Sequence, residues 1–218
     1  MAFPITPIID DFNRANEGPP PSASWGTAHG AGLKVVSNAV TANAASNSDN
    51  IGYRNDRTYQ DCECYITMVD TIGNSWFEVW VRLSTPGDTT ICGYAVATDQ
   101  TNNTLRYFRV DNASYTELGT SEPQTISDGD SLGVSIIGNT IQAYYKVGAG
   151  AWNAIGTARV DSTYTSGYLG LNVAGSSISG DNFGGGALGP GPGADSVPVG
   201  ASDAAQPITV TLSIQESG

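Results

Sequence analysis

The stretch Ile9-Asp10-Asp11-Phe12-Asn13-Arg14 decides the fold of this 218-residue chain, together with its partial repeat Ser179-Gly180-Asp181-Asn182-Phe183-Gly184-Gly185-Gly186. Both combine acidic or amide side chains with one phenylalanine, and almost the length of a domain separates them. The chain between them shows short strands and turns rather than the 3.6-residue period of an amphipathic helix. We therefore predict an all-β domain that begins and ends with these two stretches.

Alternating side chains identify the strands between these two stretches. In residues 76–83, one face is apolar and consists of Phe77, Val79, Val81 and Leu83. The opposite face consists of Trp76, Glu78, Trp80 and Arg82. Residues 33–36 and 39–42 are predicted to form a hairpin that turns at Ser37-Asn38. Short strands with frequent turn residues are typical of a two-sheet sandwich, and we expect the first apolar face to lie between its sheets.

Composition divides the chain into four parts. Residues 1–9 are predicted to be an extended arm, 10–186 the sandwich, 187–206 a Gly/Pro-rich linker and 207–218 a C-terminal strand. The last part has an apolar row made of Ile208, Val210, Leu212 and Ile214. A single strand leaves its backbone unpaired, so we expect this row to mediate assembly by pairing with a sister copy or another protein.

The charge of the chain excludes some classes of partner. It has 21 acidic and 9 basic residues and a formal net charge of −12, and Lys34 and Lys146 are its only lysines. Since no stripe of lysine and arginine exists, nucleic-acid binding is not expected. An acidic surface also argues against docking to anionic membranes.

The first residues and the cysteines bear on where the protein is made. Residues 1–7 lack the basic and apolar regions of a secretory signal peptide, so we expect synthesis in a host cytoplasm.

Three cysteines are an odd number, and Cys62 and Cys64 point the same way from one strand. We expect free buried thiols, with a bridge from Cys92 to one of the other two as the alternative.

The two terminal stretches resemble the closing strand pair of the concanavalin A-like (laminin G-like) jelly rolls. The Asp128-Gly129-Asp130 turn and the hairpin at Gly138-Asn139 are similar to features that recur in laminin G-like domains. The resemblance covers about residues 8–186. It implies an antiparallel two-sheet jelly-roll sandwich, here with a C-terminal extension that contains one extra strand. This fold serves lectins, glycanases and virion surface proteins, so it does not by itself specify a function.

No catalytic residues are predicted. Jelly-roll glycanases present a Glu-x-Asp-x-x-Glu pattern, which this chain lacks. Convergence of Asp61, Glu63 and Glu78 from neighbouring strands as an acid pair remains an alternative to ordinary solvated carboxylates. The single histidine, His29, lies in a glycine-rich loop without the motif of the lyases of this fold.

Two binding sites are predicted from side chains on strand faces and strand ends. A sugar platform would use aromatic stacking and polar hydrogen bonds from Trp76, Glu78, Trp80, Arg82 and Tyr65, and core packing of the same aromatic residues is the alternative. The resemblance also implies a structural Ca²⁺ site at Asp10, Asp11 and Asp181, because oxygen ligands suit this ion. Turn formation at strand ends is the alternative for these aspartates, and no other cofactor is expected.

A jelly roll with an Asp-Asp-Phe-Asn-Arg start, no signal peptide and an added terminal arm resembles virion surface proteins of tailed phages. The resemblance implies a non-enzymatic capsid decoration or head-fibre component at the virion surface. Its partners would be capsid protein or a sister copy. The alternative is a carbohydrate-binding, lectin-like or receptor-binding module that recognises a cell-surface glycan. A third possibility is a glycan hydrolase or lyase with an atypical site.

Overall fold

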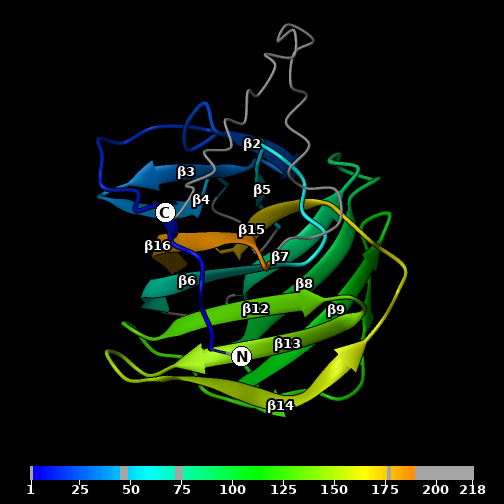
Figure 1. Cartoon of the computed structure of the whole chain (residues 1–218). Coiled ribbons are helices and arrows are strands. Elements are labelled where there is room, and N and C mark those ends of the chain that lie inside the picture. Colours follow the sequence, from blue (N-terminus) through cyan, green and yellow to red (C-terminus); the bar gives the residue numbers. More distant parts are fainter. Residues whose placement is uncertain (1, 45–48, 72–75, 176–177, 190–218) are drawn as a thin grey trace, which may run out of the picture.

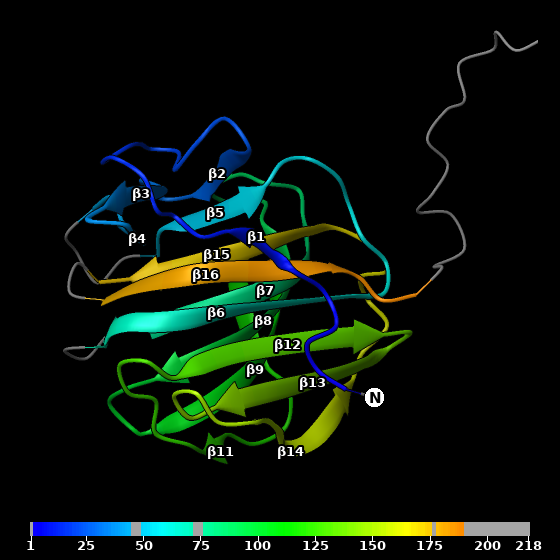
Figure 2. The same cartoon turned by 60° about the vertical axis from the view of Figure 1, so that its left-hand side comes forward.

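The structure, a computed structural model, describes residues 2–44, 49–71, 76–175 and 178–189. These residues form two antiparallel sheets that pack face to face, and their only regular elements are strands (Figures 1 and 2). No helix of the described part is long and apolar enough to cross a membrane. The predicted all-β sandwich is confirmed.

Each sheet has eight strands. Sheet A has the order β14 (Trp152–Val160), β13 (Thr140–Lys146), β12 (Ser131–Ile137), β6 (Cys62–Thr71), β16 (Ile178–Ala187), β4 (Ala39–Ala42) and β3 (Leu33–Val36), and β1 (Ile8–Asp10) pairs with β16. Sheet B has the order β10 (Ser114–Glu117), β9 (Thr104–Asp111), β8 (Cys92–Asp99), β7 (Trp76–Ser84), β15 (Tyr168–Ala174), β5 (Ile51–Arg54) and β2 (Trp25–His29), and β11 (Glu122–Pro123) pairs with β9.

The main core lies between the two sheets. Sheet B contributes Phe77, Val79 and Val81, all fully buried, as the alternation of this segment predicted. Sheet A contributes Cys62 and Cys64 from β6. All three cysteines of the chain are free, which confirms the expectation of unpaired thiols.

Leu83 is an exception to the predicted pattern. It belongs to a second apolar cluster, on the face of sheet B that is turned away from sheet A. The pairing of β7 with β8 shifts register between Val81 and Ser84, and Arg82 has a φ of 51°. Because this irregularity breaks the two-residue period, Leu83 emerges on the opposite face, and the prediction that it lies between the sheets is wrong.

The terminal strands lie side by side in the middle of sheet A, as Figure 2 shows. Asp10 of β1 is opposite Phe183 of β16, which confirms the predicted pairing. The first strand ends at Asp10 rather than continuing to Arg14, because the Asp10 carboxylate accepts the Phe12 backbone N–H and Phe12 turns to a φ of 49°. The Trp25 ring bridges the two phenylalanines, with centroids 5.8 Å from Phe12 and 5.2 Å from Phe183.

The predicted hairpin turn is found in sheet A. The hairpin of β3 and β4 forms with Ser37 and Asn38 both at positive φ, as predicted. Strand β16 continues to Ala187, and a Cβ on its Gly184 would collide with the Tyr65 ring. The predicted assembly residues Ile208, Val210, Leu212 and Ile214 lie outside the described residues.

Candidate functional site

The second apolar cluster covers the outer face of sheet B. Among its members are Trp80 of β7, Ala95 and Ala97 of β8, and Phe108 of β9. Trp80 is fully buried, and Tyr115 of β10 meets it edge-on with ring centroids 6.1 Å apart. Three strand spacings separate these two strands, about 14 Å on a flat sheet, so a tyrosine reaches Trp80 only because sheet B curves around this face.

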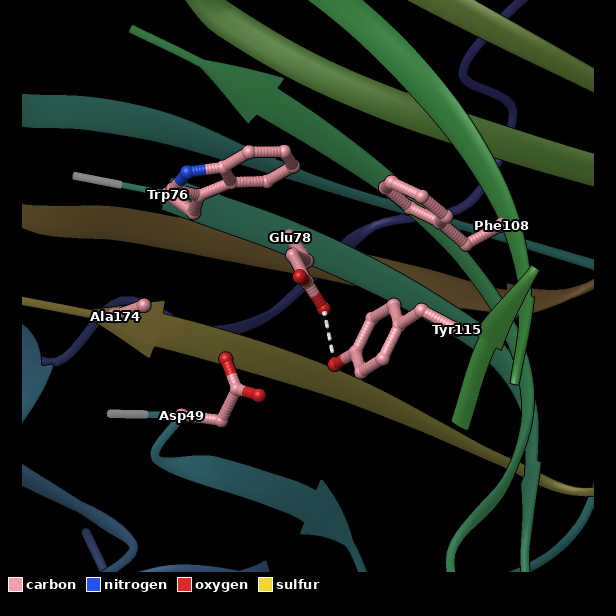
Figure 3. Close-up of a pocket in the computed structure, with 6 residues that line it drawn as sticks. All are labelled: Asp49, Trp76, Glu78, Phe108, Tyr115 and Ala174. Carbon is pink, nitrogen blue, oxygen red and sulfur yellow. Dashed lines mark hydrogen bonds between the residues drawn. The ribbon is translucent and has the colours of Figure 1, made fainter. Parts of the chain in front are cut away.

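A pocket of about 280 Å³ opens on this curved face. Its lining consists of Asp49, Trp76, Glu78, Phe108, Tyr115 and Ala174. Figure 3 shows Glu78 in the middle, with the other five residues around it. Ala97 of β8 is one of the two strand neighbours of Glu78, and Ala174 of β15 is one of the two of Trp76. These short side chains leave space for the pocket.

Hydrogen bonds hold the polar groups of the pocket in place. Glu78 Oε2 accepts from the Trp80 indole Nε1–H at 2.8 Å and from the Tyr115 hydroxyl at 3.3 Å. Asn172 of β15 donates from Nδ2 to Asp49 Oδ1 at 2.7 Å, and its side chain also hydrogen-bonds to Glu78. Asn172 therefore connects two carboxyl groups that are 29 positions apart in the sequence.

The protonation state of Glu78 follows from its surroundings. Its burial, and next the negative charge of Asp49, raise the pKa of Glu78 to about 8, and the hydrogen bonds from Asn172, Trp80 and Tyr115 only partly oppose this rise. At pH 7 the Glu78 carboxyl therefore holds a proton in the folded protein. Two neighbouring carboxyl groups of which one keeps a proton are typical of functional sites.

Aromatic rings form the wall of the pocket. The Trp76 and Phe108 ring centroids are 6.1 Å apart, and those of Phe108 and Tyr115 are 5.3 Å apart in an edge-on arrangement. The Arg106 guanidinium lies 5.4 Å from both the Trp76 and the Phe108 ring centroids. The wall already stabilises one cation by cation–π contacts.

The structure places the five predicted sugar-binding residues in three locations. Trp76 and Glu78 line the pocket, and Trp80 lies beside it as a donor to Glu78. Arg82 is buried elsewhere, where its guanidinium donates to the backbone carbonyls of Gln60, Tyr164 and Gly138 and to the Asp61 carboxylate. The bulge at Arg82 removes its side chain from the face of Trp76 and Glu78.

Tyr65 lies on the outer face of sheet A, whereas the pocket is on sheet B. Its hydroxyl donates to the Thr6 carbonyl, and its ring meets Phe3 at 6.3 Å and Trp152 at 5.8 Å between centroids. The N-terminal arm is thereby packed on sheet A, where Glu63 Oε1 accepts from the backbone N–H groups of Ile5 and Thr6 at 2.7 Å each. Residues 3–6 of the N-terminal arm therefore cover part of the outer face of sheet A.

The alternative acid set of Asp61, Glu63 and Glu78 does not assemble. Asp61 accepts from Arg82 and from the Gly138 N–H, Glu63 holds the arm on sheet A, and Glu78 lies on the outer face of sheet B. Its carboxyl neighbour is Asp49, which precedes β5 and belongs to no strand pattern. No signal in the sequence singled out Asp49, Phe108, Tyr115 or Asn172, because three of them are ordinary strand residues and the fourth is a loop residue.

The three predicted calcium ligands make other contacts in the structure. Asp10 accepts from both Arg14 terminal nitrogens at 2.7 and 3.1 Å and from Trp25 Nε1 at 2.8 Å. Asp11 accepts from the Asn13 N–H and Asp181 from Asn182. Among the residues that the structure describes, no group of three or more His, Cys, Asp or Glu side chains is arranged to hold a metal ion. Asp10 and Asp11 form ion-pair and turn contacts at the end of β1, and Asp181 accepts from its neighbour Asn182 within β16.

Asp10→Asn is expected to destabilise the fold by roughly 2 kcal/mol, since it removes a charged acceptor from the buried Trp25 indole and from Arg14. Burial alone would raise the pKa of Asp10, but the hydrogen bonds from Arg14, Phe12 and Trp25 outweigh it and lower the pKa below its ordinary value. The stability from this carboxylate is therefore present above about pH 4 and lost as the pH falls through the folded pKa. Urea unfolding at pH 7 and pH 3 measures both effects. A variant as stable as wild type at pH 7 would contradict the assignment.

Comparison with solved structures identifies similar folds. The carbohydrate binding module CBM66 from Bacillus subtilis aligns with a TM-score of 0.60 at 14% identity, over 74% of this chain and 94% of that chain. The exoplasmic/lumenal domain of VIP36, in a Ca²⁺/Man2-bound form, aligns with a TM-score of 0.57 at 13% identity. The alignment covers 83% of this chain and 87% of that chain. A prokaryotic β-1,3-1,4-glucanase (lichenase) derived from a mouse hindgut metagenome has a TM-score of 0.50 at 9% identity, over 81% and 96%.

Comparison of sequences gives no match. No family model matches the chain, and no curated protein sequence matches it. The similarity to the solved structures, at 9 to 14% identity, is one of fold. The chain shares its two-sheet jelly-roll fold with these solved structures.

Proposed function

We propose that this protein binds carbohydrate in the pocket on the outer face of sheet B. The observation that supports this best is the grouping of three aromatic rings and two carboxyl groups around one pocket of about 280 Å³. Sugar rings stack on aromatic faces through their C–H groups, while carboxyl and amide groups bond to their hydroxyls. Trp76 and Asp49 supply these two kinds of contact here.

The fold comparisons support the same proposal in a coarser way. The similar structures include a carbohydrate binding module and a Ca²⁺/Man2-bound form of VIP36. These names describe those proteins, and the low identities transfer no ligand to this chain. The proposal therefore depends on the pocket of this chain rather than on the neighbours.

Replacing Trp76 with alanine tests the proposal. The variant is expected to lose at least about tenfold in affinity for any polysaccharide that wild type binds, because aromatic stacking is removed. Affinity electrophoresis with a panel of neutral, acidic and basic polysaccharides provides the measurement. Trp152→Ala is the matched control, since Trp152 lies on sheet A beside Tyr65 and should leave binding unchanged. Failure of wild type to bind any panel member, or equal binding by Trp76→Ala, would rule the site out.

A glycan hydrolase is the second candidate, and one specific observation favours it. Glu78 holds a proton at neutral pH beside Asp49, which is the division of roles that glycosidases use between acid and base or nucleophile. We favour binding without catalysis because Glu78 is only 2% exposed and is covered by its contacts with Trp80 and Tyr115. A general acid must reach the glycosidic oxygen within hydrogen-bond distance. Release of reducing ends by wild type that Glu78→Gln abolishes would establish the hydrolase instead.

The setting of this binding is proposed from the sequence alone. A glycan-binding jelly roll at a virion surface, attached to capsid protein or to a sister copy through residues 207–218, agrees with the resemblance to phage surface proteins. Those residues lie outside the described part of the chain. Detection of the protein in purified particles by mass spectrometry tests this setting independently of the pocket.

A further inference from the structure

The pocket combines two features that suit a cationic sugar better than a neutral one. Its wall is made of the aromatic rings of Trp76, Phe108 and Tyr115, and its polar groups are the carboxyls of Asp49 and Glu78 (Figure 3). Aromatic faces attract organic cations through their negative π surface. Carboxylates form the strongest hydrogen bonds with ammonium donors. Both features favour a ligand that is positively charged.

The charges around the pocket also favour a positively charged ligand. Arg106 is the cation of the wall, and it is paired with Glu117 and, at 3.6 Å, with Asp99. Asp49 lines the pocket on the other side. The carboxylates of Asp49, Asp99 and Glu117 therefore outnumber the single Arg106 guanidinium, even while Glu78 keeps its proton. The whole chain has a formal net charge of −12, which favours the approach of cations and opposes that of anionic sugars.

We infer that the ligand of this pocket is an amino sugar with a free, protonated amine, of the hexosamine type. The inference rests on the proposed carbohydrate-binding function and specifies its ligand class. The sugar ring would stack on Trp76, and its ammonium group would donate to Asp49 while facing the rings of Phe108 and Tyr115, with the buried Glu78 carboxyl close by. Uronic and sialic acids are excluded, because their carboxylate would meet Asp49 at close range.

The same geometry links binding to proton release. At pH 7 Glu78 is protonated in the free protein, because its burial and the nearby Asp49 carboxylate disfavour a second negative charge. An ammonium group bound at Asp49, beside Glu78, stabilises the ionised form of Glu78 by its positive charge, so its binding displaces the Glu78 proton into solvent. A neutral sugar supplies no such charge and leaves the proton in place.

The test uses matched sets of short glucose- and galactose-configured oligosaccharides that differ only at carbon 2, where they have an amine, an acetamide or a hydroxyl. Titration calorimetry of the full chain at pH 7 and about 0.15 M salt, where exposed charges are screened, measures affinity. The amine set is expected to bind at least about tenfold more tightly than the other two. Titrations in two buffers of different ionisation enthalpy are expected to reveal proton release with the amine set alone.

Three variants separate a built site from general attraction to an acidic protein. Glu78→Gln and Asp49→Asn are expected to reduce the preference for the amine at least about fivefold, since each removes one carboxyl from the pocket. Asp56→Asn changes the charge equally at a side chain that is 41% exposed, and it is expected to keep the preference. Loss of preference in Asp56→Asn as well would overturn the inference.

The remaining outcomes distinguish this inference from the proposed function. Equal or tighter binding of the hydroxyl or acetamide sets would overturn the amino-sugar assignment and leave carbohydrate binding intact. Binding of choline as tight as that of the amine set would overturn it too, because the site would then recognise any organic cation. Absence of binding to every set and to the polysaccharide panel would overturn both.

Discussion

Val81→Asp is expected to lower the free energy of unfolding by about 4 kcal/mol or more, which is a large part of the stability of an ordinary domain. Val81 is fully buried in the core between the two sheets. An aspartate there loses the apolar contacts of valine and places a carboxyl among aliphatic side chains without a partner. Urea unfolding followed by tryptophan fluorescence measures the loss.

Two further variants make this result interpretable. Val69→Asp introduces the same residue on β6, where the valine is 46% exposed, and is expected to cost less than about 1 kcal/mol. Val81→Thr keeps the shape of valine and buries one hydroxyl, with an expected cost of roughly 1 to 3 kcal/mol. It remains measurable if the aspartate variant does not fold. Equal stabilities of Val81→Asp and Val69→Asp would contradict the position of Val81 between the sheets.

Glu78→Gln is expected to make the protein less sensitive to alkaline pH. In the folded chain the pKa of Glu78 is about 8, whereas the unfolded side chain has its ordinary value near 4.5. The folded state therefore holds the proton more tightly, and its stability is full below about pH 4.5 and falls as the pH rises through about 8. At about 1.36 kcal/mol per pH unit, the loss between pH 5 and pH 9 is roughly 4 kcal/mol. Glutamine does not ionise, so the variant avoids this loss.

Urea unfolding of wild type and variant at pH 5 and pH 9 provides the measurement. The stability difference between them is expected to shift by roughly 4 kcal/mol in favour of Glu78→Gln at the higher pH. Asp56→Asn, which removes an acid from an exposed side chain, is expected to follow the wild-type pH profile. Parallel profiles for wild type and Glu78→Gln would mean that Glu78 is ionised in the folded protein at pH 7. The proton release proposed above would then be wrong.

The sandwich could be predicted because its information is local. A strand in a two-sheet sandwich shows period-two alternation, and residues 76–81 display it within six positions. The Ser37-Asn38 hairpin depends on the adjacent residues only, and the structure has it as predicted. The limit of this reasoning appears at Arg82, where one residue at positive φ shifts the pattern and sends Leu83 to the other face.

The sequence predicts only part of the pocket. Trp76 and Glu78 share a strand face opposite an apolar row, which predicts them as binding residues, and both line the pocket. Tyr65 has the same residue type and alternation, yet it packs under the N-terminal arm on sheet A. Alternation assigns a residue to one of two faces of its strand, but it does not say which sheet the strand joins or what covers that face.

The sequence by itself determined the all-β class, the pairing of the terminal strands and the apolar face of Phe77, Val79 and Val81, because each depends on neighbouring residues or on a short repeated motif. Only the tertiary structure decided the site. The side chain of Asp49, in a loop, meets Glu78 of β7 through Asn172 of β15, and the curvature of sheet B carries Tyr115 across to Trp80. Contacts between strands that are distant in sequence arise from strand order and sheet curvature, which many sequence positions set together.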